Sequence, residues 1–284
     1  MKKALLFITS FMVFATFQTK AETIVETIDG IRYEIDTETK IASVKNYYII
    51  IEHHMEKEYY YEGTEATVPA YVSYNNEEYT VALSEQAFTQ SPNLVNVSLP
   101  DGITTIPGGA FARCKSLRRI NIPETVTSLG TCGNYFEENW GRPGTFNSSG
   151  IEYINIPGSV EIIGDYCFGN CINLKEVVFN EGTRIIGSGA FDGNSALENI
   201  TLPNTVDSIG RLTFYQCNLK QVNLSDNIRF IGRTCFSDNK LTEFHFSRKP
   251  QGYQNKNTWQ QSNIITNHTI RCNTHNAGIT PKAV

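Results

Sequence analysis

The sequence predicts a β-rich solenoid, in which the chain winds into successive coils and a parallel sheet forms along one face. Three observations predict it. A line of 22 or 23 residues recurs with one longer spacing, polar and apolar residues alternate at the start of each line, and a phenylalanine returns once per line. A fixed period in this range is typical of solenoid proteins, whose repeats contact only their neighbours. The lines begin at Leu94, Leu117, Ile151, Leu174, Leu197, Leu219 and Leu241.

Each line opens with a predicted β-strand. Its fourth and sixth residues are apolar and its third and fifth are nearly all polar, which is the alternation of a strand with one buried face. Proline often follows as the seventh residue, where it ends the strand without interrupting its ladder. The apolar pairs include Val97 and Leu99, Ile154 and Ile156, and Ile200 and Leu202, and the prolines are Pro100, Pro123, Pro157 and Pro203.

The rest of each line is predicted to form a corner around a buried aromatic ring. A second apolar pair stands at positions 10 and 13, and glycine usually follows at position 14, where we expect it to permit a sharp corner. A phenylalanine comes soon after, and rings stacked one per coil would fill the interior as a ladder. The ladder residues are Phe88, Phe111, Phe146, Phe168, Phe191, Phe214 and Phe236.

The segment CFGNC at residues 167–171 places two thiols four residues apart, a spacing that also suits a metal or redox site. The repeat favours another interpretation, because cysteine and asparagine exchange at position 21, where a small side chain fits a tight turn. Position-21 cysteines two coils apart would have Cα atoms roughly 10 Å apart, beyond disulfide reach. We therefore expect reduced, buried thiols at Cys114, Cys167, Cys171, Cys217 and Cys235, whereas the states of Cys132 and Cys272 are not predicted.

Residues 1–21 are predicted to be a secretory signal peptide. Two lysines precede an apolar run, and small residues precede a cleavage site after Ala21. A membrane anchor is the alternative, but the run is shorter than the roughly 20 residues that a helical span needs. Cleavage would remove three of the 24 basic residues and take the net charge from −5 to −8. This balance argues against nucleic acid as a partner, and we expect no membrane insertion after signal removal.

Both ends of a solenoid must be covered, because an open coil exposes apolar interior and unpaired backbone. Residues 22–70 are predicted to form a β-rich N-terminal cap, with strands in IRYEID and NYYIIIEHH, and residues 71–249 to hold the repeats. The cap is expected to cover the first coil.

Residues 250–284 leave the repeat and are rich in asparagine, glutamine and threonine, so they form either a C-terminal cap or a tail. Within them His268, Cys272 and His275 have spacings that a metal ion accepts. Three ligands in a short polar segment are a weak signal, however, and no metal site is predicted.

The repeated line L-x-x-[VI]-x-[LI]-P-x-x-[VI]-x-x-I-G-x-x-[AC]-F-x-x-C resembles the BspA-type leucine-rich repeat, over about residues 71–249. The resemblance implies a right-handed leucine-rich-repeat solenoid, mostly β with short helical turns and a parallel sheet on one face. Residues 62–93, which precede the first full line, also resemble the corresponding segment of such proteins, with Tyr79, Leu83, Ala87 and Phe88 in a degenerate first coil. Members of this family are associated with adhesion to host proteins such as fibronectin and fibrinogen, and the resemblance supplies no catalytic residue.

The outward residues of the predicted sheet form polar columns, which are either a binding surface or merely a soluble face. The best candidates for binding are Arg118, Arg119, Tyr153 and Glu176, because arginine and tyrosine are favoured at interfaces. We expect replacement of both arginines by glutamate to weaken binding without affecting folding.

The longer spacing between lines contains an insertion that is expected to project as a loop. It contains three aromatic residues that are either exposed anchors or folded back onto adjacent coils: Tyr135, Phe136 and Trp140.

These features predict an exported, non-catalytic binding protein, an adhesin that engages host or matrix proteins through the solenoid face. The alternatives are glycan binding and a self-associating scaffold of the cell envelope. The sequence contains no nucleophile elbow, zinc-protease motif or phosphate loop, so neither an enzymatic activity nor a cofactor is predicted. The expected partner is an extracellular protein or glycan, and the oligomeric state is not predicted.

Overall fold

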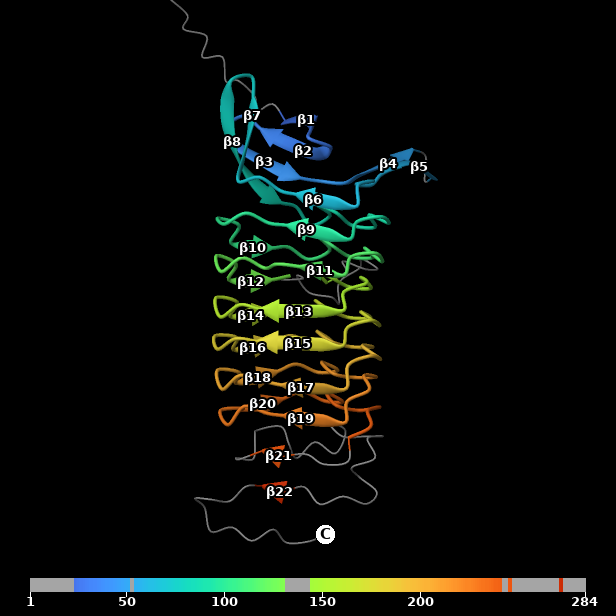
Figure 1. Ribbon diagram of the computed structural model, residues 1–284, viewed down its shortest axis with the longest axis vertical. Coiled ribbons are helices and arrows are strands. Elements are labelled where there is room, and N and C mark those ends of the chain that lie inside the picture. Colours follow the sequence, from blue (N-terminus) through green and yellow to red (C-terminus); the bar gives the residue numbers. More distant parts are fainter. Residues whose placement is uncertain (1–22, 52–53, 131–143, 242–244, 247–270, 273–284) are drawn as a thin grey trace, which may run out of the picture.

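The computed structural model describes residues 23–51, 54–130, 144–241, 245–246 and 271–272. In these residues a β-sheet cap at the N-terminal end continues directly into a solenoid, and the coils stack along the long axis of the molecule (Figure 1). The predicted signal peptide lies outside the described residues, as does nearly all of the predicted C-terminal cap or tail.

The cap is built on a five-stranded sheet with the order β1-β2-β3-β8-β7. Neighbouring strands are antiparallel except for β3 and β8, which are parallel. A separate antiparallel pair, β4 and β5, lies beside it. The segment IRYEID was predicted to be a strand, and it forms β2. The bounds are β1 Thr23–Ile28, β2 Ile31–Asp36, β3 Ile41–Val44, β4 Tyr47–Ile51, β5 His54–Tyr59, β7 Tyr71–Tyr74 and β8 Glu77–Leu83.

The cap and the solenoid interlock, so the boundary expected at residue 70 does not follow the sheets. Strand β6 (Glu65–Thr67) already pairs with the first solenoid strand, whereas β7 and β8 return to the cap sheet. Tyr79 and Val81 of β8 are buried in the cap core. The expected first coil is therefore divided: Tyr79 belongs to the cap, and Phe88 belongs to the solenoid. Strand alternation is the same in a cap and in a repeat, so it could not place this boundary.

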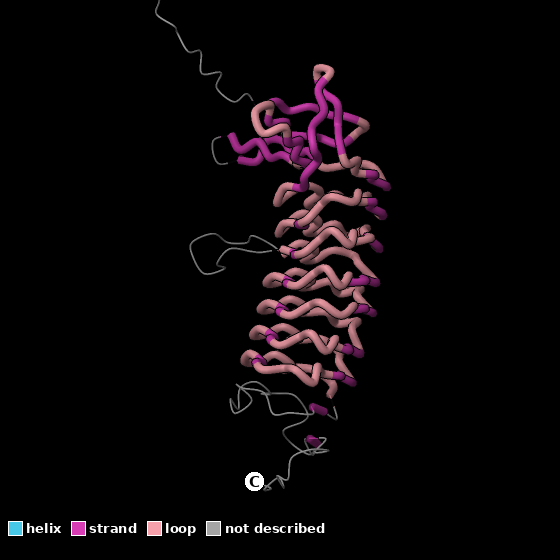
Figure 2. Tube along the Cα trace, turned by 90° about the vertical axis from the view of Figure 1, so that its left-hand side faces the viewer, coloured by secondary structure: helices cyan, strands magenta, loops and turns pink. Residues whose placement is uncertain are grey.

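The solenoid has two parallel sheets on opposite sides, one more than expected (Figure 2). The front sheet contains the predicted strands at positions 3 to 6 of each line, in three hydrogen-bonded segments that lie side by side. Its strands are β6, β9 Asn96–Ser98, β11 Arg119–Ile120, β13 Tyr153–Ile156, β15 Glu176–Phe179, β17 Asn199–Thr201, β19 Gln221–Asn223, β21 His245–Phe246 and β22 Arg271–Cys272.

The rear sheet was not predicted. It is a continuous ladder of six two-residue strands, each with one outward and one buried side chain, in the order β10-β12-β14-β16-β18-β20. The buried member is the apolar residue at position 13, such as Ile163 or Ile209. The bounds are β10 Thr105–Ile106, β12 Ser128–Leu129, β14 Ile162–Ile163, β16 Ile185–Ile186, β18 Ser208–Ile209 and β20 Phe230–Ile231.

The predicted phenylalanine ladder is confirmed. All seven rings are at most 1% exposed, and each is stacked on the next along the solenoid. Neighbouring ring centroids are 5.1 to 5.4 Å apart and neighbouring planes differ by only 6 to 9°. Near-parallel rings at this separation follow from strand spacing, because identical side chains on successive coils repeat at about 4.8 Å.

The corners contain no helix within the described residues; hydrogen-bonded turns replace the expected short helical turns. The second residue after every ladder phenylalanine has a positive φ, from 51° at Gln216 to 73° at Gly193. A left-handed residue reverses the chain at once, so a helix cannot continue through it. Only one of these seven residues is glycine, and the others accept the strain of a left-handed conformation.

Four of the five glycines at position 14 are needed for a different reason from the one expected; the exception is Gly130, which has a positive φ of 52° and fits the expected corner. Gly187 and Gly210 do not have a positive φ. A Cβ on Gly210 would lie 2.5 Å from the backbone nitrogen of Ser188, and one on Gly187 would lie 2.7 Å from the backbone nitrogen of Asp165. Both distances are shorter than van der Waals contact, so glycine here permits adjacent coils to approach rather than the chain to turn.

Replacing Phe191 with alanine is expected to lower the free energy of unfolding by about 3–5 kcal/mol, because it empties a packed aromatic site. Chemical denaturation followed by circular dichroism measures this change. The control is Ile172→Ala, since Ile172 is 59% exposed and its truncation should cost less than about 0.5 kcal/mol. Equal effects of the two substitutions would contradict the ladder.

Candidate binding site

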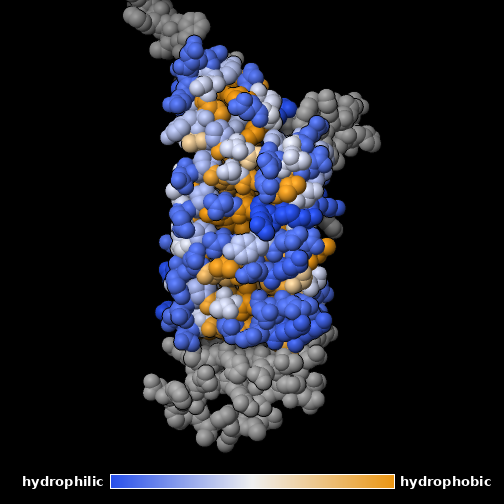
Figure 3. Space-filling model, viewed as in Figure 1, coloured by the Kyte–Doolittle hydropathy of each residue, from blue (hydrophilic) through white to orange (hydrophobic). Residues whose placement is uncertain are grey.

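The outward residues of the front sheet form a polar wall along the solenoid. Hydrophilic residues lie in rows across this face, with apolar residues visible between them (Figure 3). The side chains at positions 4 and 6 point inward as predicted; Ile154 and Ile156, for example, are fully buried. The exposed residues at position 3 are Asn96, Arg119, Tyr153, Glu176, Asn199 and Gln221, and those exposed at position 5 are Ser98, Asn121, Thr201 and Asn223.

A shallow hollow of about 390 Å³ lies on this wall, where β11, β13 and β15 run side by side. It brings together all four residues that the sequence singled out on the sheet. Two residues that the sequence analysis did not select complete its lining. The lining residues are Arg118, Arg119, Glu152, Tyr153, Lys175 and Glu176.

One side of the hollow is an ion-pair row. Glu152 lies between two cations, with carboxylate oxygens 3.5 Å from Nε of Arg118 and 3.4 Å from Nζ of Lys175. The Arg118 guanidinium also donates hydrogen bonds to the carbonyl oxygens of Lys115 and Gly150, at 3.2 and 3.1 Å. Arg118 thus ties two coils together, and its predicted contribution to binding stays a prediction.

This row continues along the solenoid with alternating sign. The residues at position 2 are Arg118, Glu152, Lys175, Glu198 and Lys220, and Nζ of Lys220 lies 2.7 Å from Glu198. Exposed pairs of this kind contribute little stability each, about 0–1 kcal/mol. If an inner coil were left out of the stack, two charges of the same sign would become neighbours in this row. The alternation therefore favours the observed pairing of coils. The recurrence of these charges at position 2 of successive lines was visible in the sequence and would have identified Glu152 and Lys175.

The other side of the hollow presents three different chemistries in adjacent strands. Tyr153 stands directly opposite Glu176 in the ladder between β13 and β15, and Arg119 comes from the neighbouring β11. Tyr153 is 38% exposed, so one part of the ring is supported and another is open to solvent. A cation, an aromatic ring and an anion on a rigid sheet suit contact with a polar partner that contains both charges and apolar groups.

Several residues considered in the sequence analysis lie outside the described residues. These include the insertion aromatics Tyr135, Phe136 and Trp140, and also Cys132, His268 and His275. The proposed contribution of the three aromatic residues to binding therefore stays a prediction. The structure describes the backbone of Cys272 in β22 but not its side chain.

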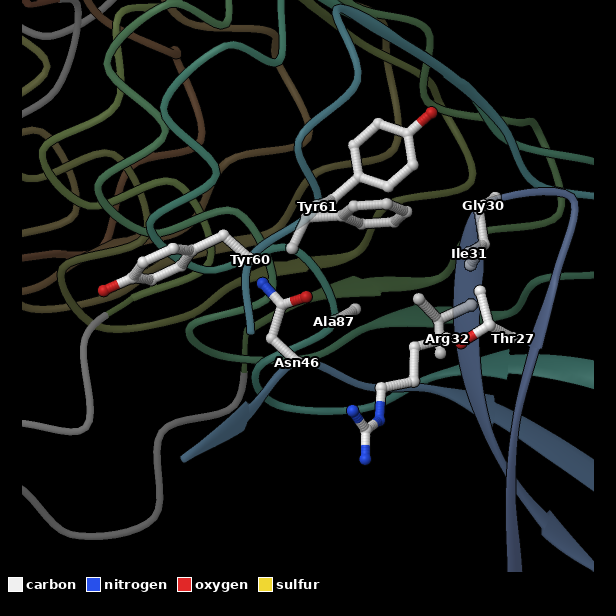
Figure 4. Close-up of a pocket in the computed structure, with 10 residues that line it drawn as sticks. Thr27, Gly30, Ile31, Arg32, Asn46, Tyr60, Tyr61 and Ala87 are labelled. Atoms are coloured by element: carbon white, nitrogen blue, oxygen red, sulfur yellow. The ribbon is translucent and has the colours of Figure 1, made fainter. Parts of the chain in front are cut away.

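A second cavity, of about 200 Å³, lies where the cap meets the first coil. Tyr60 and Tyr61 point to different sides of it (Figure 4). The Tyr61 ring meets Phe88 edge-on, with centroids 5.6 Å apart, and its hydroxyl donates to the carbonyl of Glu65. Asn46 is buried and its amide donates to the Thr89 carbonyl at 2.8 Å. These contacts cover the first ring of the aromatic ladder, so the residues stabilise the junction between the cap and the solenoid.

The five repeat thiols are reduced and buried, as predicted. Three of them donate across coils: the Sγ atoms of Cys114, Cys171 and Cys217 lie 2.9 to 3.1 Å from the carbonyl oxygen of the phenylalanine in the preceding coil. Asn239 makes the same bond through its amide, at 2.6 Å. This bond explains how asparagine replaces cysteine at position 21 in the coil of Asn239. Asn194, at the same position in another coil, is buried, and neither atom of its side-chain amide has a hydrogen-bond partner among the described residues, so the bond does not explain that exchange.

Burial also makes these thiols chemically inert. It raises the pKa of Cys114 and Cys217 to about 12 and that of Cys171 to about 11, so the protonated form persists at neutral pH. Only a thiolate attacks a disulfide or binds a metal. In the part of the chain that the structure describes, no group of three or more potential ligands is placed to hold a metal ion.

The repeat identifies the family of the chain. The family model for the BspA-type leucine-rich repeat region matches residues 74–138 and 142–265, in six copies. The chain belongs to the BspA-type leucine-rich repeat family. No curated protein matches it.

Solved structures of bacterial leucine-rich repeat proteins have the same fold. A Treponema pallidum leucine-rich repeat protein is 22% identical with a TM-score of 0.55, and the alignment covers 75% of this chain and 88% of that one. A leucine-rich repeat protein from Bacteroides ovatus is 19% identical with a TM-score of 0.54, covering 78% of this chain. The chain spans only 58% of the length of the Bacteroides ovatus protein. At these identities the likeness supports the fold alone.

The buried thiols are expected to resist labelling in the native state. In a Cys132→Ser, Cys272→Ser variant, a water-soluble disulfide reagent should modify no thiol until denaturant is added, because thiolate formation is suppressed and access is blocked. Absorbance of the released thiol measures the reaction. Rapid stoichiometric labelling of any of the five in folded protein would show that the repeat interior is open.

Proposed function

We propose that this protein is a surface-exposed, non-catalytic binding protein that engages an extracellular protein through the front sheet, and that it acts as an adhesin. Proteins of the BspA-type leucine-rich repeat family are generally cell-surface binding proteins, which supports the proposal. The predicted signal peptide supports export in the same way. No helix that could cross a membrane occurs among the described residues.

The observation that carries the proposal is the convergence of Arg119, Tyr153 and Glu176 on one hollow in the polar wall. Tyrosine and arginine supply a large share of the binding energy at protein interfaces, and they do so near the centre of the contact. Here they stand on adjacent strands of a rigid sheet, so little side-chain or backbone ordering is required on binding.

The dimensions of the front sheet also suit a macromolecule. Seven strands from β6 to β19 at about 4.8 Å spacing give a wall of roughly 30 Å, comparable to one side of a standard protein interface. The hollow is an open depression rather than an enclosed site, which does not suit burial of a small metabolite.

Glycan binding is a second candidate, favoured by the amides and hydroxyls on the same wall. Asn223 donates to the Thr201 hydroxyl at 3.0 Å, and Asn96 donates to Glu65 at 3.4 Å. Each amide retains further donor and acceptor capacity for a sugar hydroxyl. Arg119 and Glu176 are charges of opposite sign, and this favours the protein partner over a neutral glycan.

Binding to immobilised fibronectin, fibrinogen and a glycan array tests the proposal first. For whichever of the two immobilised proteins binds, Arg119→Glu is expected to raise the dissociation constant roughly tenfold or more, the usual effect of losing a central arginine. Surface plasmon resonance measures the affinity. Arg119 is the better target than Arg118, because replacing Arg118 would also remove its bonds to two backbone carbonyls.

The matched control is Lys240→Glu, an equal charge change at an exposed residue outside the hollow. It should leave affinity unchanged. Equal affinities of wild type and Arg119→Glu for a bound protein would refute the hollow as the site. Binding only on the glycan array would favour the second candidate.

A further inference from the structure

The rear sheet carries an exposed apolar stripe. Its outward residues at position 12 include Ile162, Ile185 and Phe230, which are 37%, 43% and 47% exposed. The ladder places Ile162 beside Ile185, Ile185 beside Ser208, and Ser208 beside Phe230. Three large apolar side chains therefore share one short column on the side opposite the proposed binding site. Clustered apolar side chains on a surface commonly mark a contact with another protein.

A column of alternating charge runs beside this stripe. The residues at position 11 of the same four coils are Glu161, Arg184, Asp207 and Arg229, so the sign runs minus, plus, minus, plus. Arg184 and Asp207 pair within the chain, with Nη2 3.1 Å from the carboxylate, yet the arginine side chain remains 62% exposed. Glu161 and Arg229, at the two ends, are also exposed.

This order of charges is complementary to itself when reversed. Consider a two-fold axis that lies in the plane of contact, parallel to the strands and midway between β16 and β18. Rotation about this axis places a second copy against the first, so that each column faces the same column running in the opposite direction. Glu161 then faces Arg229 of a second copy, and Arg184 faces Asp207 of that copy. The same operation places Ile162 opposite Phe230. A two-fold contact requires such a self-complementary patch.

We propose that the rear sheet, centred on the stripe Ile162, Ile185 and Phe230, is the docking surface for a second copy of this chain in an antiparallel, two-fold arrangement. Apolar contact supplies the attraction, and the charge column selects the reversed orientation, because a parallel arrangement in register would oppose like charges. The front sheets of both copies then face outward, and each remains open to a partner.

The contact is small, which sets the strength of the dimer. Four coils at about 4.8 Å spacing span roughly 15 Å, so the area falls well below the roughly 800 Å² per partner of a standard interface. The association is therefore weak and reversible, and the fraction of dimer depends on protein concentration.

Sedimentation equilibrium of the purified protein over a range of concentrations tests the inference. The weight-average mass is expected to rise from that of one chain toward that of two. Ile185→Lys should remain monomeric. Glu161→Arg should weaken association roughly tenfold or more, because the new arginine then faces Arg229 of the other copy at each end of the contact. The double variant Glu161→Arg, Arg229→Glu should restore it, because the swapped pair is again complementary.

Circular dichroism shows whether each variant is folded, and Glu176→Arg on the front sheet is the control that should dimerise like wild type. A protein that stays monomeric at every concentration would overturn the proposal, as would unimpaired association of Ile185→Lys. If Ile185→Lys fails to fold, the charge swap decides: a double variant no better than Glu161→Arg excludes the two-fold contact.

Discussion

The structure depends on one constraint, the exact superposition of successive coils around a column of phenylalanine rings. Each ring lies flat on the next, and the backbone N–H of each of the first six ladder residues donates to a carbonyl of the following coil; for Phe146 and Phe191 the distances are 2.7 and 2.8 Å. A displaced coil would therefore lose ring contact and backbone pairing together. An unpaired N–H in this interior is costly, since no water replaces its partner. The register of the aromatic column thus fixes the register of both sheets.

Other columns reinforce this register from different sides of the coil. The glycines at position 14 leave no room for a Cβ, so they hold adjacent backbones at contact distance. Four of the five cysteine and asparagine side chains at position 21, Cys114, Cys171, Cys217 and Asn239, bond to the phenylalanine carbonyl of the preceding coil. Charges at positions 2 and 11 alternate in sign along the outside. Few residue types per coil specify the interior, so the outward residues are free to vary. The front sheet accordingly has a polar outer surface, whereas the rear sheet has an apolar stripe.

Much of this was predictable because a repeat presents the same side-chain pattern many times. The ladder, the buried pairs of the front strands and the buried thiols follow from residues that recur at fixed positions. The rear sheet was harder to predict, because two-residue strands leave no alternation to read. The reason expected for glycine was wrong at Gly187 and Gly210, because a sequence does not distinguish turning from close approach. At the hollow, Arg119, Tyr153 and Glu176 were identified by residue type, whereas Glu152 and Lys175 required attention to charge spacing across lines.

Native-state hydrogen exchange measured by NMR tests the register most directly. The amides of Phe111, Phe146, Phe168, Phe191 and Phe214 each bond to the following coil. The account predicts that these five are among the slowest amides to exchange, because only unfolding of the stacked coils frees them. Exchange as fast as that of exposed turn amides would show that the coils do not stack in this register, and would contradict the account.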